Sequence, residues 1–256
     1  MDLFNLFDVL YEDADLLVVN KPAGLVCHPT KGDAWSSLIS RVRLHVGETV
    51  HPQLVNRLDR ETSGVVLVAK NAQTAGELRR IWESRAVEKQ YAAIVHGHVV
   101  PDRAVIDTPL GRDDRSNVAI KDCVRADGLP SETECAVVSR FERDEGKFTL
   151  LDVWPRTGRK HQIRIHPAHI GHPIVGDKLY GGDESLYLAF VQSRLTDEQR
   201  RKLILANQAL HAATVRFRWR ERDWVFQAEA EASFMQFCFR LECARPRTLQ
   251  RGWAKP

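Results

Sequence analysis

The stretch NRLDRETSGVVLVAK, Asn56 to Lys70, joins a charged loop to an apolar segment. Four charged residues lie within five positions (Arg57, Asp59, Arg60 and Glu61), and the chain then passes through Thr-Ser-Gly into the run GVVLVA at 64–69. A continuous run rich in β-branched residues predicts a central strand that is covered on both faces. Asp59 therefore stands where a loop meets the core, and a charge in that position needs a partner.

The composition is that of a soluble globular protein, because 43% of the 256 residues are hydrophobic and 28% are charged. No apolar run approaches the roughly 18 residues of a membrane-spanning helix. The N-terminal residues carry acids where an export signal would carry positive charge. The five cysteines, at 27, 123, 135, 238 and 243, form no CxxC pair. We therefore expect reduced thiols and a cytoplasmic protein without a membrane partner.

The net charge of +3 is only mildly basic, but the positive residues are clustered. WPRTGRKHQIRIH, at 154–166, holds four Arg or Lys residues and no acid. CARPRTLQRGWAKP, at 243–256, also holds four (Arg245, Arg247, Arg251 and Lys255). Such clusters are typical of a protein that binds a polyanion, although solvated basic faces explain them equally well.

Several other segments have the patterns of strands. Short runs of apolar and β-branched residues predict strands at 16–19, 90–99, 135–141, 147–155, 211–219 and 223–230. In HQIRIH, at 161–166, polar residues alternate with Ile163 and Ile165, which predicts a strand with Arg164 opposite the apolar side.

Three segments have helical patterns. Apolar residues at 35, 38, 39, 42 and 46 share one face, with Gly47 as the stop. Asn71 is placed to cap a second helix. TDEQ, at 196–199, fits a capping box and predicts a helix to about Ala209. Many strands with few helices favour an α+β fold, with a largely antiparallel central sheet and flanking helices. We expect one domain at 1–243 and a basic tail at 244–256.

The carboxylate of Asp59 could serve as a nucleophile, as a general base or as half of a structural ion pair. Asp59 and Glu61 could also form a glycosidase pair, although residues this close in sequence need not face one ligand. Arg164 lies in a basic segment and needs an anionic partner if it is partly buried. Asp59 is a candidate for that partner.

Four histidines, at 161, 166, 169 and 172, suggest a metal site. In a regular strand His161 and His166 would point to opposite faces, and neither Cys nor Glu completes a ligand set. We therefore predict no metal, and expect these histidines to bond the backbone and line a polar surface.

These segments together resemble the RluA family of pseudouridine synthases. NRLDRETSGVVLVAK is similar to the family signature HRLDxxTSGxxxxAK, and EKQYAAIVHG to its KxYxAxVxG segment. TGRKHQIRIHPAHIGHPIVGDKLYG, at 157–181, matches TGRxHQIRxHxxxxGHPIxGDxxYG. VVNKPAGLVCHP and LHA, at 210–212, match the flanking motifs. The resemblance runs from about Tyr11 to beyond His211, with the motifs in matching order.

The resemblance implies a fold, a reaction and a set of residues. The fold is a pseudouridine-synthase-like domain, and the reaction breaks the N1–C1′ bond of a uridine in RNA, turns the uracil and rejoins it through C5. Asp59 corresponds to the catalytic aspartate, Tyr91 to the tyrosine that packs on the target base, and Arg164 to the basic residue paired with the aspartate. Neither a metal nor an organic cofactor is implied.

The expected partner is a structured RNA, ribosomal or transfer, and the protein is expected to act as a monomer. Arg57 resembles the family residue that fills the space near the flipped base and holds phosphates. The neighbouring basic residues, which we also expect to bind RNA, are Arg60, Arg159, Lys160 and His161. Because the resemblance begins at about Tyr11, we expect no S4-type RNA-binding domain, which many members carry, before the catalytic part.

Two positions depart from the family pattern. Asn56 stands where the family usually has His, which bears on loop geometry or substrate docking, and Pro167 replaces a larger apolar residue. An RNA-binding protein that has lost catalysis is an alternative, but the intact Asp59, Tyr91 and Arg164 argue against it. A metal-dependent hydrolase is a second alternative, and the missing ligand set argues against that one.

Overall fold

The computed structural model of the chain describes residues 7–29 and 36–239. The strands within these ranges are Asp8–Glu12 (β1), Leu16–Lys21 (β2), Gln53–Leu54 (β3), Ser63–Ala69 (β4), Val87–His96 (β5), Arg103–Asp107 (β6), Leu110–Arg112 (β7), Asp122–Val124 (β8), Glu132–Arg143 (β9), Gly146–Pro155 (β10), Leu210–Trp219 (β11) and Arg222–Gln227 (β12). The helices are Leu38–Val46 (α1), Ala72–Glu83 (α2), Gln162–His169 (α3), Ser185–Val191 (α4), Asp197–Leu203 (α5) and Ala232–Phe239 (α6). The predicted tail at 244–256 lies outside the described residues.

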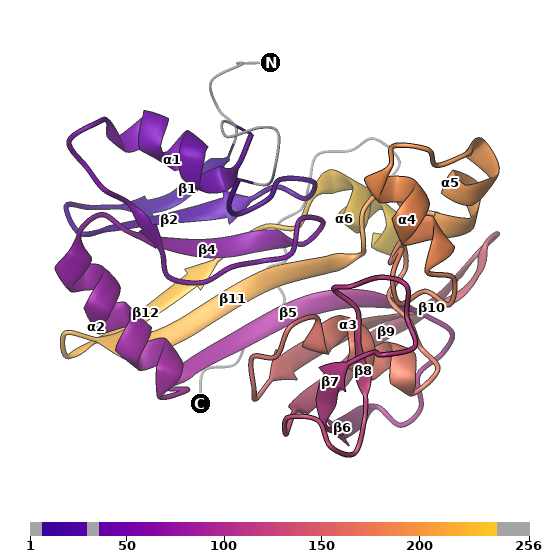
Figure 1. Cartoon of the computed structure of the whole chain (residues 1–256). Coiled ribbons are helices and arrows are strands. Elements are labelled where there is room, and N and C mark those ends of the chain that lie inside the picture. The colour runs from indigo at the N-terminus through magenta and orange to yellow at the C-terminus, as the bar shows by residue number, and fades with distance from the viewer. Residues whose placement is uncertain (1–6, 30–35, 240–256) are drawn as a thin grey trace.

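A single large sheet organises these elements. Its strands run in the order β1-β2-β4-β11-β5-β10-β9-β6, with β3 beside β4 and β12 beside β11. Among the described strands, every pair is antiparallel except β4 with β11. Figure 1 shows α2 and the turn between β11 and β12 at one end of the molecule, with α4 and α5 at the other. The predicted α+β fold with a largely antiparallel sheet is confirmed.

Strand β4 is the buried centre that its apolar run predicts, since all seven of its residues are buried. Val66 and Val68 pack in a cluster with Leu38 of α1. Val65 and Leu67 pack instead with Leu78 of α2. One helix therefore covers each face of the strand, as the sequence pattern indicates.

Gly64 allows β4 to meet β11. Its φ is +116° within a strand, and an added Cβ would lie 2.2 Å from the carbonyl oxygen of Ala212. Only glycine tolerates both the conformation and this approach. The contact places the loop before β4 beside β11, and Ala212 is in turn paired with Tyr91 of β5.

The predicted helix boundaries are mostly confirmed. The Ser37 hydroxyl accepts from the N–H of Ser40 at the start of α1, and Gly47, with φ of 86°, follows its end. The side chain of Asn71 accepts from the N–H of Thr74 and caps α2.

The predicted strand at 161–166 is wrong, because Gln162–His169 forms helix α3. Every residue from Gln162 to Pro167 is buried, so the alternation of polar and apolar side chains does not mark an exposed and a covered face. The polar members are instead satisfied inside the protein: Gln162 bonds Thr133 and the Glu132 carbonyl. A helix buried on all sides shows no amphipathic period.

The helix predicted from 196 to about Ala209 is shorter than expected. The capping box at Thr196 and Gln199 is present, but α5 ends at Leu203. Ile204 has a positive φ of 66°, and the Ala206 carbonyl accepts from the buried Lys178 ammonium. Tertiary bonding to the backbone therefore ends the helix early. No helix in the described ranges is long and apolar enough to cross a membrane.

Candidate active site

Arg164 connects two charged segments of the sequence, the loop with Asp59 and the turn with Asp177. From the buried helix α3, its Nε and Nη2 donate to the two carboxylate oxygens of Asp177, over 2.7 and 2.9 Å. Its Nη1 donates to Oδ2 of Asp59 over 2.8 Å. Burial lowers the pKa of Arg164, but the two carboxylates outweigh burial and raise it. The predicted pairing of Arg164 with Asp59 is present in the structure.

Asp177 is the fixed end of this arrangement. Its side chain has no exposed surface, and Oδ1 also accepts from the N–H groups of Leu179 and Tyr180, over 2.9 and 3.0 Å. Burial raises the pKa of Asp177, but Arg164 and the two backbone donors outweigh it and lower the pKa. Asp177 therefore stays ionised and holds the guanidinium in one orientation.

Asp59 is the open end. A third of its side chain (33%) is exposed, and its Oδ2 meets Arg164 on one side. The Nε2 of His161 lies 3.9 Å from the same oxygen. Asp59 thus presents a carboxylate that is oriented by a buried cation yet accessible from outside.

His161 forms a wall of the site beside Asp59, and only 8% of its side chain is exposed. Its Nδ1 lies 2.8 Å from the Tyr180 hydroxyl, which accepts from the N–H of Asp122. The hydroxyl proton is thus available to Nδ1, which favours a proton on Nε2, facing Asp59. Burial lowers the pKa of His161 to about 4, so the imidazole is neutral near pH 7.

The loop that carries Asp59 is anchored by the segment NKPAGL. The buried ammonium of Lys21 donates to the carbonyls of Pro22 and Leu25, each over 2.8 Å, and to that of Arg60 over 3.2 Å. Gly24 and Arg60 bond each other twice more, through Gly24 N–H to the Arg60 carbonyl and Arg60 Nε to the Gly24 carbonyl. These bonds fix the backbone directly after Asp59.

Asn56 also anchors this loop. Its Oδ1 accepts from the N–H of Leu67 over 2.8 Å, and its Nδ2 donates to the Val65 carbonyl over 3.1 Å. The side chain therefore pairs with β4 in the way that a neighbouring strand would. The departure from the family's histidine leaves the loop attached to the core.

Tyr91 lies on β5, opposite Val153 of β10 and Ala212 of β11. Its side chain packs against two apolar clusters of the core. Burial raises the pKa of Tyr91, and the negative charge of Asp59 raises it further. The phenol is therefore protonated near pH 7 and lies within the electrostatic reach of Asp59. The structure thus brings together the three residues predicted to be catalytic.

The residues predicted to bind RNA lie on two segments around this centre. Arg57 is exposed, and Arg60 is exposed with its guanidinium 5.2 Å from the ring centre of Phe190. In the loop before α3, Arg159 Nε donates to the Pro130 carbonyl. The Lys160 ammonium lies 3.0 Å from Asp122. Their role in binding RNA stays a prediction.

Glu61 does not form a second reactive carboxylate beside Asp59. It is buried and ion-paired with the buried Lys178, whose ammonium also lies 4.8 Å from the ring centre of Phe190. Burial raises the pKa of Glu61, and Lys178 opposes that shift. The glycosidase interpretation therefore loses its second carboxylate.

The histidines of this region bond protein groups. His166 donates from Nε2 to the Thr108 carbonyl, and the Nδ1 of His172 donates to the His96 carbonyl over 2.8 Å. Within residues 7–29 and 36–239, no three His, Cys, Asp or Glu side chains are grouped so that they could hold a metal ion.

Asp177, Lys178 and Tyr180 were not singled out from the sequence, although they lie inside the quoted motif. The available signal was an acid and a lysine side by side in PIVGDKLYG, an otherwise apolar and glycine-containing segment. Two adjacent charges in such a context indicate buried partners.

Comparison with known proteins agrees with the site. A family model described as RNA pseudouridylate synthase matches residues 15–169. The chain is 38% identical over 180 residues to the dual-specificity RNA pseudouridine synthase RluA of Vibrio parahaemolyticus, covering 70% of both chains. It is 37% identical to the ribosomal large subunit pseudouridine synthase D of Xanthomonas campestris, over 82% of this chain and 61% of that protein.

Among solved structures, the human RNA pseudouridylate synthase domain containing 1 is similar, with a TM-score of 0.71 and 25% identity. That match covers 90% of this chain and 86% of the human one. The chain spans between 56% and 66% of the length of four further relatives.

Proposed function

We propose, on the premise that the chain belongs to the RNA pseudouridylate synthase family, that it isomerises uridine in RNA to pseudouridine. The observation that carries the proposal is the chain of charges Asp59–Arg164–Asp177. It ends in a partly exposed carboxylate beside a protonated tyrosine. The same arrangement argues against a protein that only binds RNA, because binding requires no carboxylate facing a polyanion.

The reaction needs an ionised carboxylate and no net exchange of atoms. The N1–C1′ bond breaks, a bond from C5 to C1′ forms, the proton on C5 leaves and N1 takes up a proton. Asp59 either attacks the ribose or removes a sugar proton, and both routes require its carboxylate in the ionised form. Because substrate and product are isomers, no oxidant or reductant takes part.

Tyr91 and the exposed arginines suit the handling of the base. Taking a nucleotide out of a stack costs about a few kcal/mol, which stacking in the pocket offsets. Tyr91 offers a ring and a neutral hydroxyl beside Asp59. Arg57 and Arg60 flank Asp59 in sequence and are exposed, so they can meet phosphates at the mouth of the site.

The target that we propose is a structured ribosomal or transfer RNA, modified in the cytoplasm by a monomer. The names of the Vibrio and Xanthomonas relatives support an RNA target, and the second supports large-subunit ribosomal RNA. The basic segments around the site support the same class of partner.

The test is release of tritium from ribosomal and transfer RNA transcripts labelled with [5-³H]uridine, because the proton on C5 is lost in the reaction. We expect catalytic release that is unaffected by a chelator. Release that stops with the chelator would favour the metal-dependent hydrolase, and tight RNA binding without release would favour the inactive RNA-binding protein. Mapping pseudouridines in cellular RNA with and without the protein then identifies the target position.

A further inference from the structure

Lys89 differs from the other lysines of the described chain in having no partner for its charge. Six of those lysines form ion pairs with carboxylates: Lys70, Lys121, Lys147, Lys160, Lys178 and Lys202. Lys21 is held by three carbonyls. Within residues 7–29 and 36–239, Lys89 has neither kind of partner.

The surroundings of Lys89 make this difference significant. Its side chain is half-buried, and burial lowers the pKa of its ammonium. The nearby charge of Arg85 lowers that pKa further, and no carboxylate opposes the shift. A desolvated cation beside another cation is unfavourable unless an anion arrives from outside.

The position of Lys89 shows where that anion would lie. Lys89 is two residues before Tyr91 on β5, so the two side chains leave the strand on the same face, about 7 Å apart. Its Nζ also approaches the loop before α3, because a Cβ added to Gly158 would lie 3.7 Å from it. Gly158 is exposed, and it lies in the basic stretch RTGRK at 156–160.

We propose that Lys89 binds a backbone phosphate of the RNA, next to the nucleotide whose base stacks on Tyr91. This inference rests on the proposed function. Glycine at 158 places no side chain against the ammonium, and the basic loop adds a favourable field. Lys89 would then be a positioning residue, which holds the strand while Asp59 and Tyr91 act on the base.

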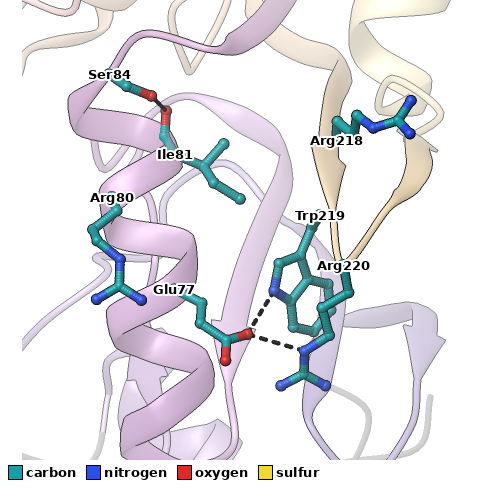
Figure 2. Close-up of a pocket in the computed structure, with 7 residues that line it drawn as sticks. All are labelled: Glu77, Arg80, Ile81, Ser84, Arg218, Trp219 and Arg220. Carbon is teal, nitrogen blue, oxygen red and sulfur yellow. Dashed lines mark hydrogen bonds and ion pairs between the residues drawn. The ribbon is translucent and has the colours of Figure 1, made fainter.

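The groove between α2 and the β11–β12 hairpin, about 480 Å³ in volume, is a less suitable phosphate site. Figure 2 shows the Glu77 carboxylate within it, bonded to Trp219 Nε1 over 2.8 Å and to Arg220 Nε over 3.0 Å. Arg220 is also paired with Asp15. A carboxylate in the groove repels a phosphate, and this arginine already has two anionic partners.

The experiment compares Lys89→Met, which keeps an unbranched stem without the charge, with Lys89→Arg. The control is Lys147→Met, an exposed lysine that lies six residues from the Tyr91 partner Val153 along β10, about 20 Å away. Binding of unmodified ribosomal and transfer RNA transcripts is measured across a potassium chloride series. Every variant also carries Asp59→Asn, so that turnover does not change the RNA.

For Lys89→Met we expect about tenfold weaker binding at low salt, with the slope of log K against log salt reduced by about 0.7–0.9. Lys89→Arg and Lys147→Met should keep the slope of the parent. Equal slopes for Lys89→Met and Lys147→Met would overturn the inference. Tritium release by the wild-type protein is scored separately, so failure of the proposed function is distinguishable from failure of this inference.

Gly158→Asp provides a second test that leaves the strand intact if Lys89→Met fails to fold. The new carboxylate, on an exposed residue, would pair with Lys89 and compete with the phosphate. Its effect on RNA affinity should be at least threefold smaller in the background of Lys89→Gln, a neutral polar replacement at this half-buried position, because the competed contact is already gone. Equal effects in both backgrounds would mean that the new charge repels RNA without acting through Lys89, and would contradict the inference.

Discussion

The loop that carries Asp59 and the turn that carries Asp177 present carboxylates to the same guanidinium, yet the two regions differ in every other respect. Asp177 has no exposed surface and accepts two backbone N–H groups besides Arg164. Asp59 is one third exposed and has the arginine on one side. The buried acid fixes the cation, and the cation orients the acid that remains accessible. Accessibility and the number of partners, more than charge, separate a reactive carboxylate from a structural one.

The largest expected effect is on turnover, from Asp59→Asn. The substitution keeps the shape and removes the charge that the chemistry requires, so turnover should fall about ten-thousandfold, equivalent to about 5.4 kcal/mol in activation free energy. The melting temperature and RNA affinity should stay near those of the parent. Tritium release and a thermal melt measure the two quantities, with the exposed Asp127→Asn as the control. Turnover within tenfold of wild type would contradict the assignment of Asp59.

In contrast to Asp59→Asn, whose main effect is on turnover, we expect the main effect of Asp177→Asn on stability. It leaves the buried side of the Arg164 guanidinium without an anion and presents amide protons to a donor, so the free energy of unfolding should fall by about 3–5 kcal/mol. Urea unfolding measures the loss, and Asp127→Asn should change stability by less than about 0.5 kcal/mol. If Asp177→Asn lost turnover at unchanged stability, the distinction between the two acids would fail.

Two substitutions of Tyr91 test whether this residue acts through stacking of its ring or through its hydroxyl group. If stacking dominates, Tyr91→Ala should reduce kcat/KM by an amount equivalent to about 1–3 kcal/mol. Tyr91→Phe, which keeps the ring, should cost less. Rates of tritium release at subsaturating RNA measure both variants. Equal losses for the two would point to the hydroxyl beside Asp59 as the functional group.

The smallest expected effect is a pH dependence of stability that arises beside Asp59. Burial lowers the pKa of His161 to about 4, so between pH 6.5 and about 4 the unfolded chain binds a proton that the native site does not. The contribution to stability is complete above pH 6.5 and falls by about 1.4 kcal/mol per pH unit below it. Urea unfolding at pH 7 and pH 5 should show a smaller decrease for His161→Gln than for wild type. Parallel decreases would mean that His161 is not buried in its neutral form.

One half of the site could be predicted, because its residues lie in segments with recognisable sequence patterns. The run after Gly64 indicates a strand covered on both faces, and β4 is one. The carboxylate in the loop before this strand, at the edge of the core, points to Asp59. The family motifs add Tyr91 and Arg164, which the fold brings to the same place.

The other half could not be predicted, because its signals are tertiary. The alternation around Arg164 predicts a strand, but alternation is informative only when one face is exposed, and residues 162–167 of α3 are all buried. Asp177 gives no indication in sequence that it shares a cation with Asp59, from which it is 118 residues distant. The anchoring role of Lys21 is also invisible, because its three acceptors are backbone carbonyls.

The junction at Gly64 and Ala212 determines how accurately the proposed catalytic residues are aligned. Two residue pairs join β4 to β11 there. The loop before β4 carries Asp59, whereas Tyr91 lies on β5, on the other side of β11, and Arg164 lies in α3, which contacts β9 and β10. A methyl group at position 64 would force the strands apart by more than 1 Å, judged from ordinary Cβ contacts of about 3.4 Å or more against the 2.2 Å found. The relative position of the two halves of the proposed catalytic centre therefore depends on one strand junction, and that junction requires a residue without a side chain at position 64.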